Sequence, residues 1–343
     1  MSKKPTLRDI AKYADVALST VSQALNNKPG VSAEMRQHIL DVAQELGYQQ
    51  KTIIETPFAN DIKTIGLLTK HIKNEPSRIN PFYSHIIVGA ERECSRHGIS
   101  LMYASIEVDD NSRAISLPAM LLDDRVDGVI VVGAFLEETI SDISNRAGQS
   151  IVFVDAYTSL NSDFDSVLID NTEGASIAVN HLLEMGHRHI ALVGSNTQSY
   201  PSIRERRMGY LNALQQHHIQ PIIIESSLTR GSGYASAQLI IEEHPSVTAV
   251  FACNDEVAIG VLNGLQANGL SIPSDISIVG FDDIDLAQAV SPPLTTVHLD
   301  KVMMGIMAVR HLQDRATDPE RRSLKTLIST QLIKRKSVRN INV

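Results

Sequence analysis

The sequence predicts an α/β protein in which an N-terminal helix-turn-helix head precedes two doubly wound α/β subdomains. Three observations lead to this fold class. The first fifty residues carry apolar side chains at helical spacing. From Thr64 onward, short apolar runs alternate with amphipathic segments, a pattern typical of parallel sheets covered by helices. These runs form two sets separated near residues 156–165, which indicates two similar subdomains.

The head is expected to contain three short helices, at Leu7–Tyr13, at residues 18–26 and after Ser32. Thr6 can cap the first helix and Ser32 the third. Because only residues 14–17 connect the first two helices, the segment is typical of a helix-turn-helix. The side chains expected to face inward on the second and third helices are Val21, Leu25, Met35, Ile39, Val42, Ala43 and Leu46.

The second helix carries side chains slim enough to enter a DNA major groove. Ser19, Thr20 and Ser22 can hydrogen-bond phosphates or base edges. Leu18 can contact a thymine methyl group, and Gln23 can form two hydrogen bonds with adenine. Ordinary surface helices also carry serine and glutamine, so these residues alone do not identify a recognition helix.

The two subdomains are expected to be built on strands that are buried on both faces. Continuous apolar runs such as Val129–Val132 favour such strands, and ligands of such sheets bind at the carboxyl ends of the strands. The expected strands are Thr64–Thr69, Ser100–Ala104, Gly128–Val132, Ile151–Val154, His189–Val193, Pro221–Ile224, Val247–Ala252 and Ile276–Val279.

Composition limits the class of protein. The net charge is −8, yet residues 1–50 hold six basic and five acidic side chains, so the acidic excess lies in the rest of the chain. Neither a signal peptide nor a membrane span is apparent, which favours a soluble cytoplasmic protein. Cys94 and Cys253 form no metal-binding pair, and no cofactor is expected.

Nearly the whole chain carries an ordered series of short motifs. In the head these are Thr6–Ala11, Ser19–Ser22, Leu25–Asn26, Val31–Ser32 and Glu45–Tyr48. In the remainder they are Lys63–Leu67, Asn80–Tyr83, Val126–Gly128, Asp170–Asn171, Gly186–Ile190, Arg204–Tyr210, Asn254–Asp255, Val279–Asp283 and Pro293–Val297. The series resembles the lactose-repressor/galactose-repressor (LacI/GalR) family of transcriptional regulators, and its order over the full length is more specific than any single motif.

The resemblance implies a homodimeric repressor that binds near-palindromic, double-stranded operator DNA. It implies a helix-turn-helix head at residues 1–48, a hinge at 49–63 and an effector-binding and dimerisation domain at 64–338, similar to periplasmic sugar-binding proteins. Three crossings of the chain are expected, with subdomain 1 at about 64–160 plus 294–318 and subdomain 2 at about 161–293 plus 319–338. The implied DNA-binding residues are Thr6, Leu18, Ser19, Thr20, Ser22, Gln23, Asn26 and Lys28.

The resemblance also implies a site between the subdomains for a small polar effector, most simply a sugar. Arg206 matches the effector-binding arginine of the family, whose guanidinium is a rigid fork of donors. Asn254 and Asp282 match positions that hold ligand hydroxyls or amides, whereas Phe82 and Tyr83 match an aromatic pair that packs on a ring face. The full expected set is Phe82, Tyr83, Asp155, Arg206, Leu228, Asn254 and Asp282.

Several residues of the head depart from the family pattern. Asp15 stands where the family commonly has glycine, and Ala17 where it commonly has serine. Replacement of a serine cap by alanine typically costs ~1 kcal/mol of helix stability. Gln23 replaces a frequent arginine, which predicts a half-site richer in adenine and thymine that is bound modestly.

The hinge departs most from the family pattern. Pro57 occupies the position of the leucine that relatives insert into the minor groove, and proline inside a helix costs ~3 kcal/mol. We expect an irregular hinge around Ile54 and Pro57. The alternative is a shorter helix that begins at Pro57 and uses Phe58 as the wedge. In the body, the connection from Lys70 to Ile79 is longer than usual, and Leu228 replaces a frequent aromatic ring.

Two other classes of protein are less consistent with the sequence. An enzyme is not expected, because twelve histidines are scattered and no nucleophile elbow, phosphate loop or metal-spaced cluster is present. A purely sugar-binding protein would not need residues 1–50. The main alternative is a ligand-sensing protein of the same fold whose DNA binding is weakened or lost. In the favoured interpretation, effector and operator affinities are coupled by ~1–3 kcal/mol, with the sign undetermined.

Overall fold

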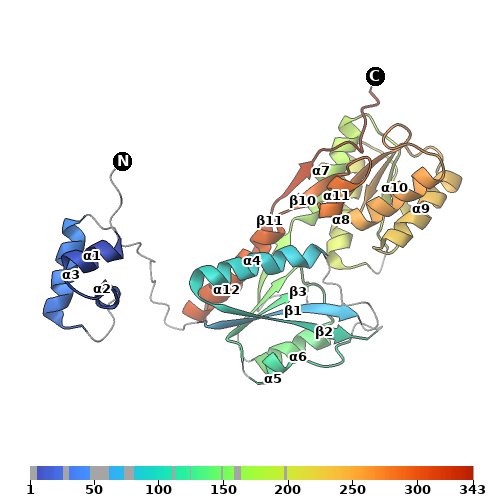
Figure 1. Cartoon of the computed structure of the whole chain (residues 1–343). Helices are drawn as coiled ribbons and strands as arrows, with labels where there is room; N and C mark the ends of the chain where they lie inside the picture. Colours follow the sequence, from blue (N-terminus) through green and yellow to red (C-terminus); the bar gives the residue numbers. More distant parts are fainter. Residues whose placement is uncertain are drawn as a thin grey trace. The chain divides into compact units, whose positions relative to one another are not determined.

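The computed structural model describes residues 6–25, 31–46, 62–72, 81–109, 113–123, 125–147, 150–157, 164–196 and 199–342. The chain divides into two compact units, Met1–Phe58 and Ala59–Val343, which we call the head and the body. The expected α/β fold class, a helical head followed by two α/β subdomains, is confirmed (Figure 1).

The head consists of α1 (Leu7–Tyr13), α2 (Leu18–Leu25) and α3 (Ala33–Glu45). The first helix begins at Leu7 as predicted, directly after Thr6, whose backbone N–H and hydroxyl both donate to Oδ2 of Asp9 at 2.7 Å. Met35 was predicted to face inward, but it is 38% exposed because it lies on the first turn of α3, before the stretch that packs on the other helices. The buried apolar core of the head contains Ile10, Ala14, Val21, Ala24, Ile39 and Ala43.

The first sheet of the body has six described strands in the order β11-β5-β4-β3-β1-β2, and each runs parallel to its neighbours. Their bounds are β1 (Thr64–Ile72), β2 (Ser100–Val108), β3 (Gly128–Val132), β4 (Ser150–Val154), β5 (Asp165–Ile169) and β11 (Lys325–Ile328). The helices of this subdomain are α4 (Pro81–His97), α5 (Ala119–Leu122), α6 (Glu137–Ala147) and α12 (Lys301–Thr317).

Successive residues of a strand point to opposite faces of the sheet, so apolar runs in this subdomain build two cores. Ile130 and Val132 of β3 pack toward α4 and α12, whereas Val129 and Val131 pack toward α5 and α6. Figure 1 shows α4 and α12 together on one side of this sheet, with α5 and α6 on the other. Burial of both faces explains why the strands were detectable as continuous apolar runs.

The second sheet also has six strands, in the order β12-β10-β9-β8-β6-β7. Among the described strands of this sheet, only β12 runs antiparallel to its neighbour. Helices α7 and α8 cover one face, and α9 and α10 cover the other. The elements are α7 (Asn171–Glu184), β6 (Ile190–Val193), α8 (Pro201–Gln216), β7 (Ile222–Ile224), α9 (Arg230–Glu243), β8 (Ala249–Ala252), α10 (Asp255–Ala267), β9 (Ser277–Asp282), α11 (Asp285–Ala289), β10 (Thr295–Leu299) and β12 (Thr330–Ile333).

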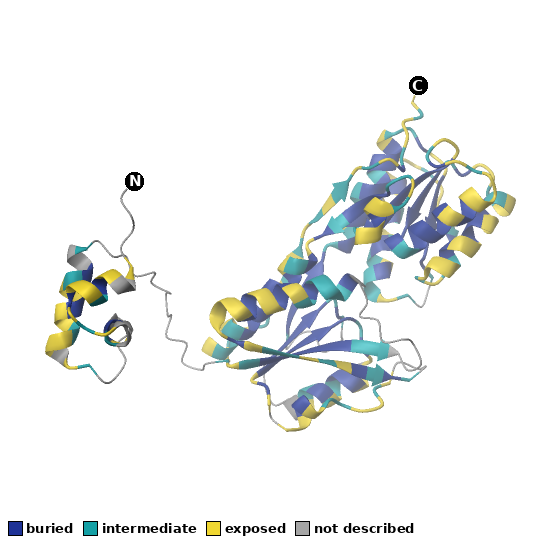
Figure 2. Cartoon of the chain, in the orientation of Figure 1, coloured by how far each residue is buried: buried dark blue, intermediate teal, exposed yellow. Residues whose placement is uncertain are grey.

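Figure 2 shows the strands of both sheets as largely buried and the outer faces of the helices as exposed. All eight predicted strands are present, with ends shifted by a few residues. The chain crosses three times between the sheets, as predicted: before α7, before α12 and before β12. The body therefore consists of two α/β subdomains: each sheet has a core of its own on one face, and a single apolar core contains residues from the other faces of both sheets.

The predicted limits of the subdomains are wrong at three strands. Residues 161–169 were assigned to subdomain 2, but β5 pairs with β4 in the first sheet. Residues 294–299 were assigned to subdomain 1, but β10 pairs with β9 in the second sheet. Residues 319–328 were assigned to subdomain 2, but β11 pairs with β5. Each of these strands has polar residues among its apolar ones, so its pairing was not apparent from an apolar run.

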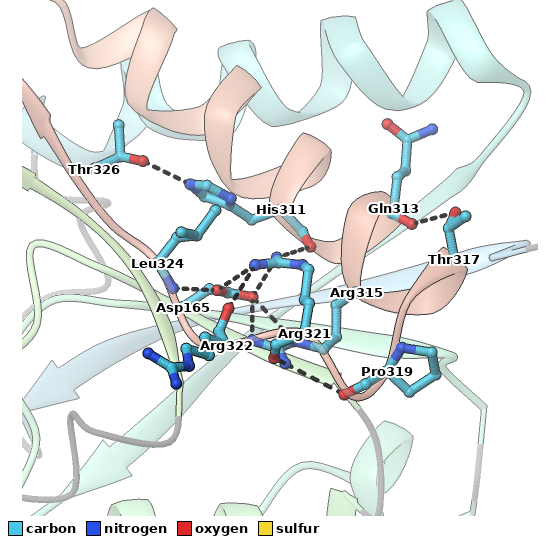
Figure 3. A network of polar contacts seen from close by, with 10 residues as sticks. All are labelled: Asp165, His311, Gln313, Arg315, Thr317, Pro319, Arg321, Arg322, Leu324 and Thr326. Carbon is cyan, nitrogen blue, oxygen red and sulfur yellow. Dashed lines mark hydrogen bonds and ion pairs between the residues drawn. The ribbon is translucent and has the colours of Figure 1, made fainter.

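A buried ion-pair network explains why β5, α12 and β11 lie together (Figure 3). Asp165 begins β5 and is only 1% exposed. Its Oδ2 lies 3.1 Å from Nη2 of Arg315 and 2.6 Å from Nη2 of Arg321. The backbone N–H of Leu324 donates to Oδ1 at 2.7 Å. The polar start of β5 is thus compensated by two guanidinium groups about 150 residues later in the chain.

Candidate DNA-binding head and ligand site

The turn before α2 contains Asp15 and Ala17, two of the residues of the head that depart from the family pattern. Asp15 has φ of +50°, a left-handed conformation that glycine adopts most readily and aspartate tolerates. The N–H groups of Thr20 and Val21 donate to the carbonyl of Ala17 at 2.9 and 3.2 Å. Ala17 therefore stands at the N-terminal end of α2, where its methyl group cannot accept a capping hydrogen bond.

The other end of α2 is held by a residue that the sequence did not single out. Nη1 of Arg36 on α3 donates to the carbonyl of Ala24 at 2.9 Å and to that of Gln23 at 3.3 Å. These are among the last carbonyls of α2, which have no partner within the helix. Arg36 therefore fixes α2 against α3, while the Gln23 side chain remains exposed.

The structure describes the side chains of three of the eight predicted DNA-binding residues. Thr6 and Gln23 are exposed and Thr20 is half-buried. Leu18, Ser19 and Ser22 lie on α2, but their side chains fall outside what the structure describes. Asn26 and Lys28 lie outside the described residues, as do the hinge residues Ile54, Pro57 and Phe58. Contact with DNA by this set stays a prediction.

Arg206 on α8 is the centre of the predicted ligand site. Its Nε donates to Oδ1 of Asn171 at 2.9 Å, and its Nη1 donates to the carbonyl of Cys253 at 2.6 Å. Nη1 also lies 2.9 Å from Oδ1 of Asp282. The guanidinium carbon lies 3.9 Å from the centre of the Phe281 ring. Among the described residues, no hydrogen bond reaches Nη2, so that nitrogen retains donors for a ligand.

Asp282 ends β9 in the left-handed region, with φ of +107°. Burial raises the pKa of its carboxyl, although the charges of Arg206 and Lys301 oppose the rise. Lys301 is buried at the start of α12, and its Nζ donates to the carbonyls of Asp282 and Asp283. Because Nζ lies 5.8 Å from the centre of the Phe82 ring, Lys301 connects α12 and α4 with the end of β9.

Asp155 follows β4 and also has a left-handed backbone, with φ of +52°. Its Oδ1 is buried, and it accepts no hydrogen bond from the described residues. Burial raises the pKa of this carboxyl to about 7, against the opposing charge of Arg206 and with the support of Asp282 and Glu205. A shielded acceptor without a partner is costly, so a ligand hydroxyl that donates to it would gain stability.

The aromatic pair lies at the start of α4. The ring centres of Phe82 and Tyr83 are 5.4 Å apart, with planes at 80°. The Tyr83 hydroxyl approaches Gly133, where any side chain would collide with it. Burial, followed by the charge of Asp155, raises the pKa of Tyr83, so its hydroxyl remains a hydrogen-bond donor at physiological pH.

Asn254 and Leu228 contact each other rather than the other predicted residues. Oδ1 of Asn254 accepts the N–H of Val257 at 2.8 Å and so caps α10, and its Nδ2 donates to the carbonyl of Leu228 at 3.2 Å. The Leu228 side chain is half-buried and packs on the main core. Part of the Asn254 amide is therefore committed to the fold, and its contact with a ligand stays a prediction.

The structure brings Tyr83, Asp155, Arg206 and Asp282 within electrostatic range of one another, although they were predicted from separate motifs. The group combines donors, an unpartnered acceptor and an aromatic face, which suits a small polyhydroxylated ligand. Among the residues that the structure describes, no cluster of His, Cys, Asp or Glu could hold a metal ion. No helix in the described part of the chain could span a membrane.

Three residues near Arg206 were not predicted as site residues: Tyr157, Asn171 and Glu205. Asn171 and Glu205 belong to motifs in which neither residue was given a role, whereas Tyr157 carried no signal of its own. All three are joined by hydrogen bonds to one another, and Asn171 is bonded to Arg206. Only the fold reveals this arrangement, because the three residues come from three elements.

The head and the body match the models of two different families. Residues 6–51 match the model of bacterial regulatory proteins of the lacI family. Residues 179–338 match the periplasmic binding protein-like domain. The expected combination of a helix-turn-helix head with a body of the periplasmic-binding-protein type is confirmed.

Individual relatives extend this similarity over the full length. The chain is 31% identical to the ribose operon repressor of Haemophilus influenzae, covering 97% of this chain and 98% of the relative. It is 33% identical to the probable HTH-type transcriptional repressor ExuR of Bacillus subtilis, covering 98% and 99%.

Solved structures are similar over the same span. The transcriptional regulator CelR in complex with cellobiose has a TM-score of 0.70 at 27% identity, covering 97% of this chain and 99% of that one. The lac repressor dimer bound to operator and the anti-inducer ONPF has a TM-score of 0.70 at 26% identity, covering 98% and 100%.

A DNA-binding head joined to a two-subdomain ligand-binding body defines a ligand-controlled transcriptional regulator. The chain belongs to the LacI family of bacterial regulatory proteins.

Proposed function

We propose that this protein is a sequence-specific transcriptional repressor that binds near-palindromic operator DNA as a homodimer. Its operator affinity is controlled by a small polyhydroxylated effector, most simply a sugar, bound around Arg206. Its place of action is the cytoplasm, where the operator is, and it catalyses no reaction. The observation that carries this proposal is the open hydrogen-bonding capacity of the site, with Nη2 of Arg206 and Oδ1 of Asp155 both without partners among the described residues.

The choice of a sugar rests on the balance of donors and acceptors. Arg206 supplies fixed donors, and its orientation is set by Asn171, Asp282 and the Phe281 ring. Asp155 supplies an acceptor for a hydroxyl, and Phe82 supplies an aromatic edge or face for the apolar side of a sugar ring. Relatives bound to cellobiose or ribose support this chemistry.

Control of DNA binding follows from the three crossings of the chain. Residues from both subdomains approach the site, so ligand binding favours one relative orientation of the two sheets. A changed orientation alters the separation of the two heads in a dimer and therefore their fit to two half-sites. The coupling is expected to be ~1–3 kcal/mol and reciprocal, so operator DNA also changes sugar affinity.

The test begins with selection of binding sites from random duplex DNA by the full-length protein. Fluorescence anisotropy then measures operator affinity without sugar and with ribose or cellobiose in excess. We expect an enriched palindromic site and a change in its Kd of about 5- to 150-fold with an active sugar. Arg206→Lys keeps the charge but loses the planar fork, so it should retain the sugar-free Kd and lose the response.

Two results would overturn the proposal in different ways. Failure to enrich any sequence would favour the alternative, a ligand sensor with lost DNA binding, for which Asp15 and Ala17 give a structural reason. Enrichment of an operator whose Kd in Arg206→Lys responds to sugar as in the wild type would place the effector elsewhere. A strong guanine preference at the base nearest Gln23 would contradict the expected adenine contact.

A further inference from the structure

A short hydrogen bond joins the two subdomains beside the predicted ligand site. Tyr157 lies just after β4 of the first sheet, and its neighbour Ala156 is buried in a core of that subdomain. Glu205 lies on α8, which is fixed to the second sheet through Tyr210, whose hydroxyl donates to the carbonyl of Ile190 at 2.9 Å. The Tyr157 hydroxyl donates to Oε2 of Glu205 at 2.6 Å, so the bond crosses from one subdomain to the other.

Asn171 connects this bond to Arg206. It is the first residue of α7, immediately after the first crossing, and is 1% exposed. Its Nδ2 lies 3.1 Å from Oε2 of Glu205 and 3.2 Å from the Tyr157 hydroxyl, and it donates to both. Its Oδ1 accepts Nε–H of Arg206 at 2.9 Å. Because arginine nitrogens only donate, the amide must keep its oxygen toward Arg206 and its nitrogen toward Glu205.

We propose that Tyr157, Glu205 and Asn171 form an interdomain latch that sets the orientation of the two subdomains and positions Arg206 for the effector. The latch joins the end of β4, the first crossing and α8, the three segments that must move relative to one another if the subdomains rotate. The positioning of Arg206 rests on the proposed function, whereas the control of subdomain orientation does not.

The chemistry of the latch favours an arrangement that persists over the physiological pH range. A neutral hydroxyl that donates to a carboxylate forms the stronger, charge-assisted type of hydrogen bond. Burial, the hydrogen bond to Glu205 and the charges of Glu205 and Asp155 raise the pKa of Tyr157, and the Asn171 amide opposes them. The hydroxyl therefore stays protonated and keeps its role as donor.

Another contact between the subdomains lacks these properties. Nζ of Lys70 lies 3.3 Å from the Tyr200 hydroxyl and 5.4 Å from the ring centre. Tyr200 is 46% exposed, so water competes for this contact and lowers its contribution. The latch is shielded and connected to Arg206, unlike the Lys70–Tyr200 contact, and it adds to the buried contact that Lys301 makes with the carbonyls of Asp282 and Asp283.

The test measures the distance between subdomains by pulsed electron spin resonance on the full-length protein. Cys94 and Cys253 are buried, so spin labels are attached through Glu91→Cys on α4 and Glu243→Cys on α9, which are exposed positions. Labelled protein is diluted with unlabelled protein so that each dimer carries one labelled chain. We expect a single narrow distance distribution in otherwise unchanged protein, and a broad or shifted one after Tyr157→Phe.

Matched variants separate a latch from a general loss of packing. Tyr103→Phe removes a hydroxyl that bonds Thr69 at 2.8 Å within the first sheet, so it should leave the distribution narrow. Glu205→Gln keeps an acceptor oxygen and should also remain narrow, whereas Glu205→Ala should behave like Tyr157→Phe. A distribution that is unchanged in both Tyr157→Phe and Glu205→Ala would overturn the latch.

Sugar titration tests the second part of the proposal. Asn171→Asp keeps the oxygen near Arg206 but places a second carboxylate beside Glu205, so we expect ribose or cellobiose, whichever the wild type binds, to bind about tenfold or more weakly. An unchanged affinity would refute positioning of Arg206 by Asn171. If neither sugar binds the wild type, the same titration is run with the sugar found by thermal-shift screening, and the distance measurement stands independently of the proposed function.

Discussion

Two aspartates of the first sheet, Asp155 and Asp165, show how the same side chain serves opposite purposes. Asp165 begins β5 and is surrounded by donors from Arg315, Arg321 and the Leu324 backbone. Asp155 follows the end of β4, and its buried Oδ1 accepts no hydrogen bond from the described residues. Because β4 and β5 are parallel, the two carboxyl groups belong to opposite edges of the sheet.

The difference separates a carboxylate that holds the fold together from one that can still bind a ligand. At the amino edge, the Asp165 network fixes the returning segment that leads into β11. At the carboxyl edge, where open α/β sheets bind ligands, Asp155 keeps an acceptor without a partner and a left-handed backbone. A buried carboxylate whose oxygens all have hydrogen-bond partners therefore supports the fold. A buried carboxylate with an oxygen that lacks a partner marks a candidate site.

The largest expected effect concerns Asp165. Asp165→Ala leaves Arg315 and Arg321 without their shared partner, and removal of one side of a buried ion pair typically costs ~3–5 kcal/mol. We expect a clearly lower free energy of unfolding of the body in a urea titration followed by circular dichroism. The same substitution at Asp155 serves as control and should cost far less, because no bonded partner is lost from its Oδ1. Equal losses for both variants would remove the distinction between the two aspartates.

The next effect is the pH dependence of stability due to Asp155. Its pKa is raised to about 7 in the fold, so between its ordinary value and pH 7 the folded protein binds more protons than the unfolded chain. Stability therefore falls as pH rises through this interval. The raised pKa corresponds to about 4 kcal/mol, so we expect Asp155→Asn to gain about that much relative to the wild type at pH 8 and to lose most of this advantage at pH 4. A difference independent of pH would contradict the raised pKa.

The helix-turn-helix, eight of the strands and the approach of Arg206 to Asp282 could be predicted, because each depends on local patterns or on motifs of a known family. The polar start of β5 could not, since burial of Asp165 requires two arginines far away in the chain. Asn254 was expected to face a ligand, but its amide also caps α10, a use that spacing alone does not distinguish. Tyr157 and Glu205 meet only through the crossing of the chain.

A smaller effect is expected at the start of α2 in the head. Ala17→Ser adds a hydroxyl at the position whose carbonyl accepts the N–H groups of Thr20 and Val21. A serine cap should stabilise the head by ~1 kcal/mol and strengthen operator binding by up to about tenfold. Thermal unfolding monitored by amide signals of residues 6–25 measures the first effect, and anisotropy measures the second. Ala17→Val gives no new acceptor, and valine is as poor a cap as alanine, so this control variant should show neither effect.

The smallest expected effect concerns the backbone conformation of Asp15, which resembles that of Asp155. Asp15 and Asp155 have nearly the same φ, +50° and +52°, but Asp15 is exposed. Asp15→Gly should stabilise the head by about 0.5 kcal/mol, because glycine adopts this conformation without strain. Removal of a negative charge from the head should also make the fall of operator affinity with salt slightly steeper, because salt then no longer screens a repulsion of the phosphates. A destabilised head would show that the Asp15 side chain makes a favourable local contact.

The role of Asp155 in ligand binding is tested most directly by calorimetric titration of an active sugar into the wild type, Asp155→Asn and Asp165→Asn at pH 8. We expect Asp155→Asn to bind the sugar at least about tenfold more weakly, since a charged acceptor for a ligand hydroxyl is lost. Asp165→Asn, where folded, should bind with nearly unchanged affinity. Wild-type affinity in Asp155→Asn would contradict the assignment of Asp155 to the ligand site.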